Sequence, residues 1–306
     1  MIKKILKRFP KAYQFAKAVR LKYDQFAWAL RLKCCRVMSN ARYFAYPVSP
    51  RVRTKLDARV IITLTSYPPR FATLHLTLKN LLTQDVASYQ VILWLYKEDF
   101  EALPDAIKRL EKNPLFSIRL CKENIKSYKK LIPALREYKE YFLVTADDDA
   151  YYPTTWLRTL INGYNDTVKA VVGLRGHIIA VDEKNTILPY KQWQGNIDAT
   201  TLDKKVFLTG LGGILYPPHC FDEEVFNQAN FISVCGSTDD IWFFYMLHRN
   251  GFICKKIGKA FPDIVWENSQ ETALFLENVH NFGNDKAITA MTKIYGNPLS
   301  LDFGQD

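Results

Sequence analysis

The sequence predicts an α/β protein with a mostly parallel sheet, preceded by a basic amphipathic helix, and three observations support this fold class. Short apolar and β-branched runs alternate with amphipathic helical patterns through the first half of the chain. At 306 residues and 48% hydrophobic content, the chain can bury a large core. The positive charge is concentrated at the N-terminus.

The net charge of +11 comes from one segment. Residues 1–42 hold 12 of the 42 Lys and Arg but only one of the 31 Asp and Glu, Asp24, so the rest of the chain holds 30 of each. A nucleic-acid surface needs basic residues spread along a face that follows the phosphates. The neutral body therefore argues against a nucleic-acid partner.

The N-terminal segment has the pattern of an amphipathic helix. Apolar residues recur at spacings of three and four, and basic residues occupy the other faces. The stripe consists of Phe15, Val19, Tyr23, Phe26, Leu30, Cys34 and Val37. No apolar run reaches the roughly 20 residues of a membrane-spanning helix, and we find no signal-peptide core. We predict that residues 1–42 bind an anionic membrane surface. The alternative is a helix that packs this stripe on the main domain.

Pro47 and Pro50 indicate a linker, so residues 1–55 form the helical segment with its linker, and a compact domain occupies 56–306. The first half of that domain alternates strands and helices, which is typical of βαβ units. In chain order we expect strand 59–65, a helix through Leu74–Leu82, strand 90–95, helix 99–110, strand 117–121, helix 128–138 and strand 141–145. The double proline in 66–70 keeps that loop from becoming helical.

The second half of the domain is less regular. We expect a helix at 154–163, a strand at 170–174, loops through 176–205, a strand or hairpin at 207–216, a helix from about 238 to 251 and a last helical segment within 280–295. Gly210, Gly212 and Gly213 interrupt the 207–216 segment, where a ligand could approach the backbone. The alternative is a tight bend.

Three aspartates, Asp147, Asp148 and Asp149, directly follow the apolar strand 141–145. Like charges at the end of a buried strand repel one another and resist desolvation, so a cation is expected beside them. The carboxyl ends of parallel strands are also where α/β sheets bind ligands. In an extended backbone Asp147 and Asp149 would point the same way, so that both share one ion, or one binds the ion and the other a ribose. The alternative is that the three acids cap the next helix and face water.

Two other groups of polar residues are candidates for the same site. Asp239 and Asp240 open an apolar helix, where Ser237 or Thr238 as the N-cap would be a purely structural explanation. Lys130 is a candidate contact for a phosphate or nucleobase, and a solvated first turn is the alternative. The six cysteines form no CxxC pair, which favours a reducing, cytosolic compartment.

These residues resemble a known family, the metal-dependent glycosyltransferases of GT-A fold, and within it the bacterial family 2-like enzymes of surface polysaccharide biosynthesis, such as lipopolysaccharide or capsule. The resemblance covers about residues 58–295. It depends on the segments ITLTSYPPR, KKLIPAL, TADDD and STDDIW. It implies a three-layer α/β/α fold with a central, mostly parallel mixed sheet and makes residues 56–306 the catalytic domain.

The resemblance also implies a set of site residues. Asp147 and Asp149 would hold Mn²⁺ or Mg²⁺ bridging the diphosphate of a nucleotide-sugar donor, most simply a UDP-sugar, and Asp148 would touch the nucleotide or sugar. The other implied roles are donor binding by Ser66, Tyr67, Arg70, Lys130, Gly212 and Gly213, a general base at Asp240 beside Asp239, and a third metal ligand at His280.

The implied reaction is transfer of a hexosyl group, with inversion, to a glycan or lipid-linked acceptor at the inner face of the cell membrane, by a peripheral protein. A positioned carboxylate takes the acceptor proton while the metal stabilises the leaving diphosphate. A retaining transferase and a sugar-1-phosphate nucleotidyltransferase are the alternatives. The loop after the first strand lacks the glycine that a nucleotidyltransferase usually carries there.

Overall fold

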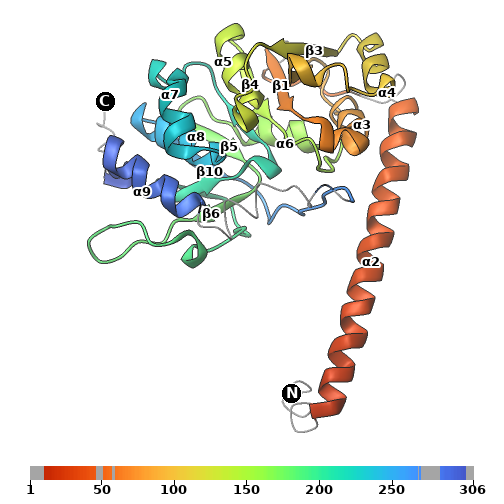
Figure 1. Cartoon of the computed structure of the whole chain (residues 1–306), viewed down its shortest axis with the longest axis horizontal. Helices are drawn as coiled ribbons and strands as arrows, with labels where there is room; N and C mark the ends of the chain where they lie inside the picture. The colour runs from red at the N-terminus through yellow and green to blue at the C-terminus, as the bar shows by residue number, and fades with distance from the viewer. Residues whose placement is uncertain (1–9, 46–50, 57–58, 268, 270–282, 301–306) are drawn as a thin grey trace.

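The computed structural model describes residues 10–45, 51–56, 59–267, 269 and 283–300. Within them, the chain folds into a mostly parallel sheet covered by helices on both faces, with one long helix projecting from the body (Figure 1). The predicted linker prolines, Pro47 and Pro50, lie outside the described residues.

Eight of the described strands form the central sheet, in the order β3-β2-β1-β4-β9-β5-β10-β7. Their bounds are β1 Val60–Thr65, β2 Gln90–Tyr96, β3 Phe116–Cys121, β4 Phe142–Thr145, β5 Ala170–Gly173, β7 Thr201–Asp203, β9 Ile214–Tyr216 and β10 Ile253–Lys256. The β1–β2, β1–β4, β2–β3 and β5–β10 pairs are parallel. Strand β9 runs antiparallel between β4 and β5, and β7 is antiparallel at the edge. Strands β6 (Gly176–Ile178) and β8 (Val206–Leu208) form a separate pair.

Successive side chains of a strand point to opposite faces of the sheet, and β1 feeds two separate cores. Val60, Ile62 and Leu64 belong to the core under one layer of helices, and Ile61 belongs to the other core. The first layer contains α3 (Phe71–Leu81), α4 (Asp105–Lys108) and α6 (Trp156–Gly163). The second layer contains α5 (Ile132–Glu137), α8 (Asp239–Arg249) and α9 (Gly283–Tyr295). This arrangement confirms the predicted three-layer α/β/α fold class.

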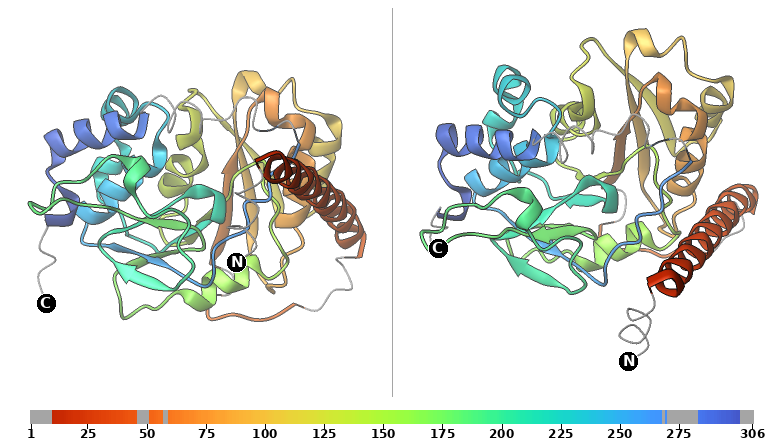
Figure 2. Two further views of the ribbon diagram at one scale, coloured as in Figure 1. Left: turned by 90° about the horizontal axis from the view of Figure 1, so that it is seen from below. Right: turned by 60° about the horizontal axis from the view of Figure 1, so that its bottom comes forward.

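The predicted N-terminal helix is present as α2, from Pro10 to Ala45. Its C-terminal part lies beside α3, and the rest extends away from the body (Figure 2). Leu32, Cys35 and Ser39 are the buried residues of its described part. The predicted stripe is on another face: Val19, Tyr23, Phe26, Leu30 and Val37 are each at least half exposed. Packing of this stripe on the main domain is therefore ruled out.

Other details differ from the expectation. The helix predicted at 99–110 is one turn of α-helix between 3-10 turns, because Pro104 restricts its neighbour and can only begin a helix. The segment 207–216 is not a hairpin, since β8 pairs with β6 and β9 enters the main sheet. All six cysteines are free thiols. None of the helices in the described part of the chain has the length and apolar character needed to cross a membrane.

Candidate functional site

The three aspartates lie where β4 ends, at the carboxyl edge of the parallel strands. Asp148 and Asp149 are 8% and 4% exposed, and Asp147 is more open, with 28% of its side chain exposed. The alternative that the three acids cap the next helix and face water is therefore wrong. The extended backbone is also wrong, because Asp148 and Asp149 form a turn, and Asp147 pairs with Lys130 whereas Asp148 and Asp149 pair with Arg70.

Arg70 holds two of these acids from the end of a 3-10 turn, Pro68–Arg70, which follows β1. The expectation that the double proline keeps 66–70 from becoming helical is wrong, because proline is well tolerated in the first turn of a helix. The Arg70 Nη1 forms ion pairs with Asp148 Oδ1, at 3.2 Å, and with Asp149 Oδ2. The Ser66 hydroxyl donates to Asp148 Oδ2 at 2.5 Å, and the Tyr67 ring lies beside the Arg70 guanidinium. Burial and the neighbouring Asp149 raise the pKa of Asp148 to about 7, although Arg70 and Ser66 act in the opposite direction. The predicted donor loop and the aspartate triplet therefore form one cluster.

Lys130 joins the two acidic motifs of the sequence. Its Nζ lies 3.1 Å from Asp147 Oδ1 and 3.0 Å from Asp239 Oδ2. Its backbone carbonyl accepts a hydrogen bond from Thr63 Oγ1 on β1, which fixes the base of the side chain. Burial alone would lower the pKa of Lys130, but the surrounding aspartates raise it well above its ordinary value. Lys129 and Lys130 are 2% and 8% exposed. The alternative that Lys130 belongs to a solvated first helical turn is therefore wrong.

Asp240 lies in the first turn of α8, on the same side as Lys130. Its Oδ2 accepts a hydrogen bond from the Gly210 amide at 3.3 Å. The residue is partly exposed, but its carboxyl group is surrounded by protein atoms, and burial together with Asp239 raises its pKa to about 7. Thr238 is the N-cap residue, yet its hydroxyl donates to Cys235 O and makes no capping bond to the helix. Helix capping by the Thr238 side chain therefore does not explain why these polar residues precede α8.

The three glycines have different roles. A Cβ on Gly210 would lie 2.9 Å from Lys130 Nζ and 3.1 Å from Asp147 Oδ1, so this glycine borders the acidic cluster. A Cβ on Gly212 would meet the backbone of Arg175, and one on Gly213, at φ +81°, would clash with the Trp156 ring. Gly212 and Gly213 therefore allow close packing and a bend, while their predicted contact with a donor sugar stays untested.

Two positions that the sequence did not reveal support the site. Tyr152 accepts a hydrogen bond from the Asp147 amide at 2.9 Å and donates to Leu211 O at 3.2 Å, which ties the triplet to the glycine segment. Arg175 binds Thr209 Oγ1 at 2.8 Å and Asp263 Oδ1 at 2.9 Å beside that segment. The sequence pattern around Tyr152 indicates only a residue of the apolar core. The hydrogen bonds of its hydroxyl join segments that are brought together by the tertiary fold.

In the part of the chain that the structure describes, the assembled site holds more acidic than basic side chains. Five carboxyl groups, those of Asp147–Asp149 with Asp239 and Asp240, surround two cations, Arg70 and Lys130. Among the described residues, no three His, Cys, Asp or Glu side chains converge as a ready metal site. His280, the predicted third ligand, lies outside the described residues. A metal held here would therefore need ligands beyond the described side chains.

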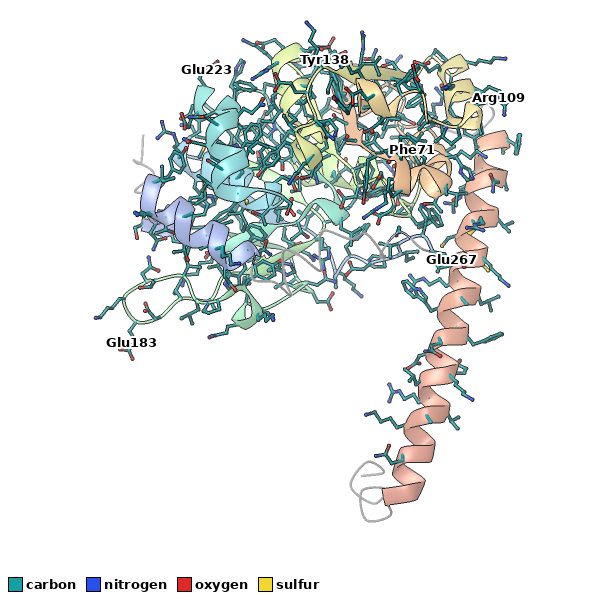
Figure 3. All side chains as sticks on the ribbon, viewed as in Figure 1. Phe71, Arg109, Tyr138, Glu183, Glu223 and Glu267 are labelled. Atoms are coloured by element: carbon teal, nitrogen blue, oxygen red, sulfur yellow. The ribbon has the colours of Figure 1, made fainter. Side chains whose placement is uncertain are left out.

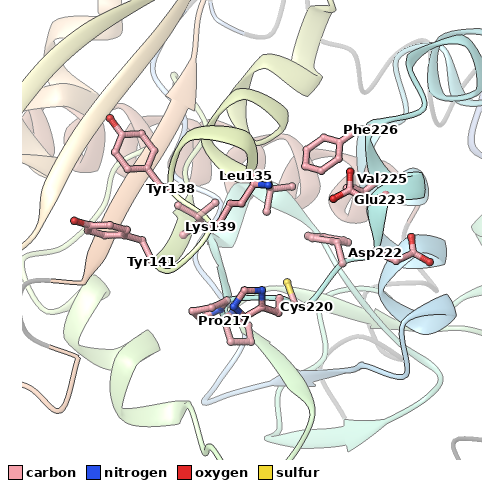
Figure 4. A pocket seen from close by; sticks show the side chains of 14 residues that line it. Leu135, Tyr138, Lys139, Tyr141, Pro217, Cys220, Asp222, Glu223, Val225 and Phe226 are labelled. Carbon is pink, nitrogen blue, oxygen red and sulfur yellow. The ribbon is translucent and has the colours of Figure 1, made fainter.

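A pocket of about 280 Å³ opens near the other end of β4, where that strand begins (Figure 4). Residues 135–143 and 217–226 contribute its walls, including the rings of Tyr138, Tyr141 and Phe226. The aspartates follow the opposite end of the same strand. This pocket is therefore separate from the acidic cluster.

Comparisons with known proteins give only distant similarity. No protein-family model and no curated protein matches the chain. Among solved structures, it is similar to the mannosyltransferase PcManGT from Pyrobaculum calidifontis in complex with GDP-Man and Mn²⁺, at TM-score 0.40 and 15% identity over 88% of this chain and 85% of that one. It is also similar to 4-diphosphocytidyl-2C-methyl-D-erythritol synthase from Anaerococcus prevotii, at TM-score 0.41 and 12% identity over 76% and 96%. These scores are too low to support a functional argument.

Proposed function

We propose that this protein is a metal-dependent glycosyltransferase that moves a hexosyl group from a nucleotide-sugar donor to a glycan or lipid-linked acceptor. The observation that carries the proposal is the convergence of both acidic motifs on Lys130. Asp147 and Asp239 are about ninety residues apart in the sequence, yet each lies within about 3 Å of the same ammonium group. A leaving diphosphate and a proton acceptor have to meet in this way around one reacting carbon.

The residues present fit a hard divalent cation. Mg²⁺ and Mn²⁺ prefer carboxylate and phosphate oxygens, and the site has three more carboxylates than cationic side chains. Asp147 is the accessible ligand, and Asp149 would share its carboxylate with Arg70. Phosphate oxygens of the donor and water would complete the coordination. When bound, the metal would neutralise charge on the departing diphosphate.

The side chains of the chain divide the remaining work. Asp240 would accept the proton of the attacking hydroxyl, because its raised pKa makes the carboxylate a stronger base and the Gly210 amide holds one of its oxygens. Lys130 would keep Asp239 and Asp147 on either side of the reacting position through its two ion pairs. Asp148, Ser66, Tyr67 and Arg70 would face the nucleotide.

The finer assignments rest on the family resemblance. We propose UDP as the nucleotide, inversion at the anomeric carbon, and a role in lipopolysaccharide or capsule assembly at the cytoplasmic face of the membrane. The exposed stripe and basic residues of α2 support attachment to an anionic membrane surface. Residues 1–55 would then serve as the membrane segment and 56–306 as the catalytic domain.

Thermal-shift screening of UDP-, GDP- and CMP-sugars, with and without Mn²⁺, tests the proposal. We expect one donor class to stabilise the protein only when Mn²⁺ is present. Asp147→Asn and Asp149→Asn should each abolish this shift, whereas Asp105→Asn, at an exposed acid of α4, should retain it. If the Mn²⁺-dependent thermal shift persists in both Asp147→Asn and Asp149→Asn, the proposal that these residues hold a metal at the donor site is wrong.

Product analysis distinguishes the related activities. Anomeric NMR of the transferred sugar should show inversion, and retention would exclude Asp240 as the base of a single displacement. If the protein instead forms nucleotide sugars from a nucleoside triphosphate and a sugar 1-phosphate, it is a nucleotidyltransferase. No binding and no turnover of any of these donors would contradict the proposed function.

A further inference from the structure

The docked end of α2 packs directly behind the acidic turn. Six side chains form one buried group, which we call the docking cluster: Leu32 and Cys35 of α2 with Leu76, Tyr151, Ile264 and Trp266. Tyr151 is only two residues from Asp149, and its ring meets that of Trp266 edge to face at 6.1 Å. The predicted membrane helix therefore contacts the segment that carries the proposed metal ligands.

A hydrogen bond reinforces this contact. Arg42 of α2 donates from Nη1 to the Tyr151 hydroxyl at 2.8 Å, and Tyr151 is 8% exposed. A hydrogen bond from a charged group is stronger than a neutral one and is directional, so it fixes the side chain as well as holding it. Arg36 also lies 3.6 Å from Glu267, but both side chains are about half exposed and this pair contributes little. Figure 3 shows Glu267 beside α2.

Residues 264–267 connect this contact to Asp149. The Trp266 amide donates to Asp149 O at 2.8 Å, and the Tyr151 amide donates to Ile264 O at 2.9 Å. Ala150 pairs with Val265 between them, and the Ser269 hydroxyl donates to Trp266 O at 2.8 Å. Residues 149–151 are thus bonded along their whole length to the segment that lies under α2.

Helix α3 adds a further set of contacts to the backbone that follows the aspartates. Thr77 Oγ1 donates to Ala150 O at 3.0 Å and accepts from the Trp266 indole at 2.8 Å. The backbone after the aspartates is therefore held by α3 and by residues 264–267, and α2 contacts both. Arg70 and Lys130 bind the aspartates as well, through ion pairs with Asp149 and Asp147.

We infer that the docked end of α2 is a positioning element for the acidic turn, acting through the hydrogen bond from Arg42 to Tyr151. The inference rests on the proposed function only for the role of the turn in metal binding. Tyr151 and Arg42 are positioning residues, because neither touches the site. Loss of their bond should loosen residues 149–151 and weaken the metal site while the core remains folded.

Two measurements on the full-length protein test this. Hydrogen exchange of peptides covering 146–152 reports the turn without any metal, and electron paramagnetic resonance of free Mn²⁺ gives the metal dissociation constant. Tyr151→Phe keeps the ring contact and removes the hydroxyl. We expect faster exchange at 149–151 and an Mn²⁺ affinity about tenfold weaker, the factor that about 1.4 kcal/mol produces. Arg42→Met should behave in the same way, and Arg42→Lys should restore most of the affinity.

Two control variants separate positioning from general destabilisation. Asn40→Ala removes a contact between α2 and Lys79 of α3, whose Nζ donates to Asn40 Oδ1 at 2.6 Å, without touching Tyr151. Lys184→Gln removes one positive charge from a distant exposed loop. Both should keep wild-type exchange at 149–151. If Asn40→Ala matches Tyr151→Phe, or if Tyr151→Phe matches wild type, the inference is wrong.

The outcomes also separate this inference from the proposed function. If wild type binds Mn²⁺ but no nucleotide sugar, the proposed function fails, and the comparison of variants still decides the inference. If wild type binds no Mn²⁺, the metal-dependent function fails and hydrogen exchange alone decides whether α2 positions the turn. Unchanged exchange in Tyr151→Phe would overturn the inference in either case.

Discussion

Asp240 combines a buried carboxyl group with several acidic neighbours. Asp239 and Asp147 add negative charge around it, and Lys130 compensates only in part, so its pKa rises to about 7 from an ordinary value near 4. A carboxyl group whose pKa is raised by folding stabilises the folded state only while it is protonated. The free energy of unfolding therefore falls as the pH rises from about 4 to 7. The ionised form of Asp240, which can act as a base, destabilises the folded protein.

This predicts that Asp240→Asn stabilises the metal-free protein at high pH. With a chelator present at pH 8, the neutral amide should raise stability by about 1–2 kcal/mol, which is a Tm increase of a few degrees. The difference should shrink as the pH falls and vanish only below about pH 4, where Asp240 is protonated in the unfolded as well as in the folded state. Scanning calorimetry from pH 4 to pH 8 checks the trend. A stability difference independent of pH would show that Asp240 is not a strained carboxylate.

Tyr152 gives a second prediction for a single residue. Tyr152→Phe leaves the Asp147 amide without its acceptor and Leu211 O without its donor, which costs about 1–3 kcal/mol where the groups are buried. We expect a lower Tm together with weaker Mn²⁺-dependent donor binding, measured by calorimetry and titration. Tyr164→Phe, at the far end of α6, is the matched control and should bind the donor normally. Equal donor affinity in both variants would contradict a role for Tyr152 in placing Asp147.

The sequence predicted the acids of the site better than their partners. The triplet, the pair at 239–240 and Lys130 were visible in the sequence, because carboxylates after an apolar strand are unusual and charged side chains stand out. Ser66 and Arg70 were named only through the family resemblance. Their pairing was not predictable. Whether Arg70 binds Asp149, or Lys130 joins Asp147 to Asp239, depends on contacts between segments that are distant in the chain.

At the scale of elements, the segment from β8 to β9 shows what the glycines do. Gly213 adopts φ +81°, where L residues are disfavoured, and its missing side chain leaves room for the Trp156 ring. The Trp156 indole in turn donates to Gly212 O at 2.8 Å. The turn before β9 is thereby fixed against α6, and it places Gly210 beside Lys130.

We therefore predict a large difference between two glycine substitutions. Gly213→Ala combines backbone strain with a clash against a buried ring and should cost at least about 3 kcal/mol. Gly258→Ala is the matched control, because Gly258 has φ +69° but no atom within 4 Å of the added Cβ. It should cost only about 1 kcal/mol. Urea denaturation gives both values, and equal losses would show that the Trp156 contact does not matter.

Elements with strong local patterns were the predictable ones. Strands β1 to β5 and helices α3, α6 and α8 lie close to their predicted positions, since each has a long apolar run or a clear period. The 207–216 segment could be read as a strand or a hairpin, because the glycines indicate a break but not the partner strand. The π-helical turn Phe231–Cys235 before α8 has no local signal of this kind.

At the scale of the whole molecule, α2 has two apolar faces, one buried and one exposed. The face containing Leu32 and Cys35 is buried against the body, and the stripe containing Phe26 and Leu30 is exposed. The N-terminal half of α2 lies away from the body of the protein (Figure 3). Helical periodicity predicted a stripe, but it could not say which face would meet the domain, because both faces carry apolar residues.

An exposed apolar stripe beside basic residues predicts binding to anionic lipid. Burial of apolar side chains in the headgroup region and attraction of Lys and Arg, at about 1 kcal/mol for each, act together at such a surface. The full-length protein should float with vesicles that contain anionic phospholipid and remain unbound with neutral ones. High salt should weaken this binding, because it screens the charges.

The double substitution Phe26→Ser with Leu30→Ser tests which face is responsible. It removes two side chains that are 69% and 52% exposed, so folding should be unaffected and flotation should fall at least about tenfold. Leu202→Ser, at a 44% exposed leucine of β7, is the control and should float like wild type. If the double variant floats normally at low salt, charge alone attaches the protein and the stripe serves some other partner. Because α2 also backs the acidic turn through Arg42, the same flotation samples allow exchange at 149–151 to be compared on and off the membrane.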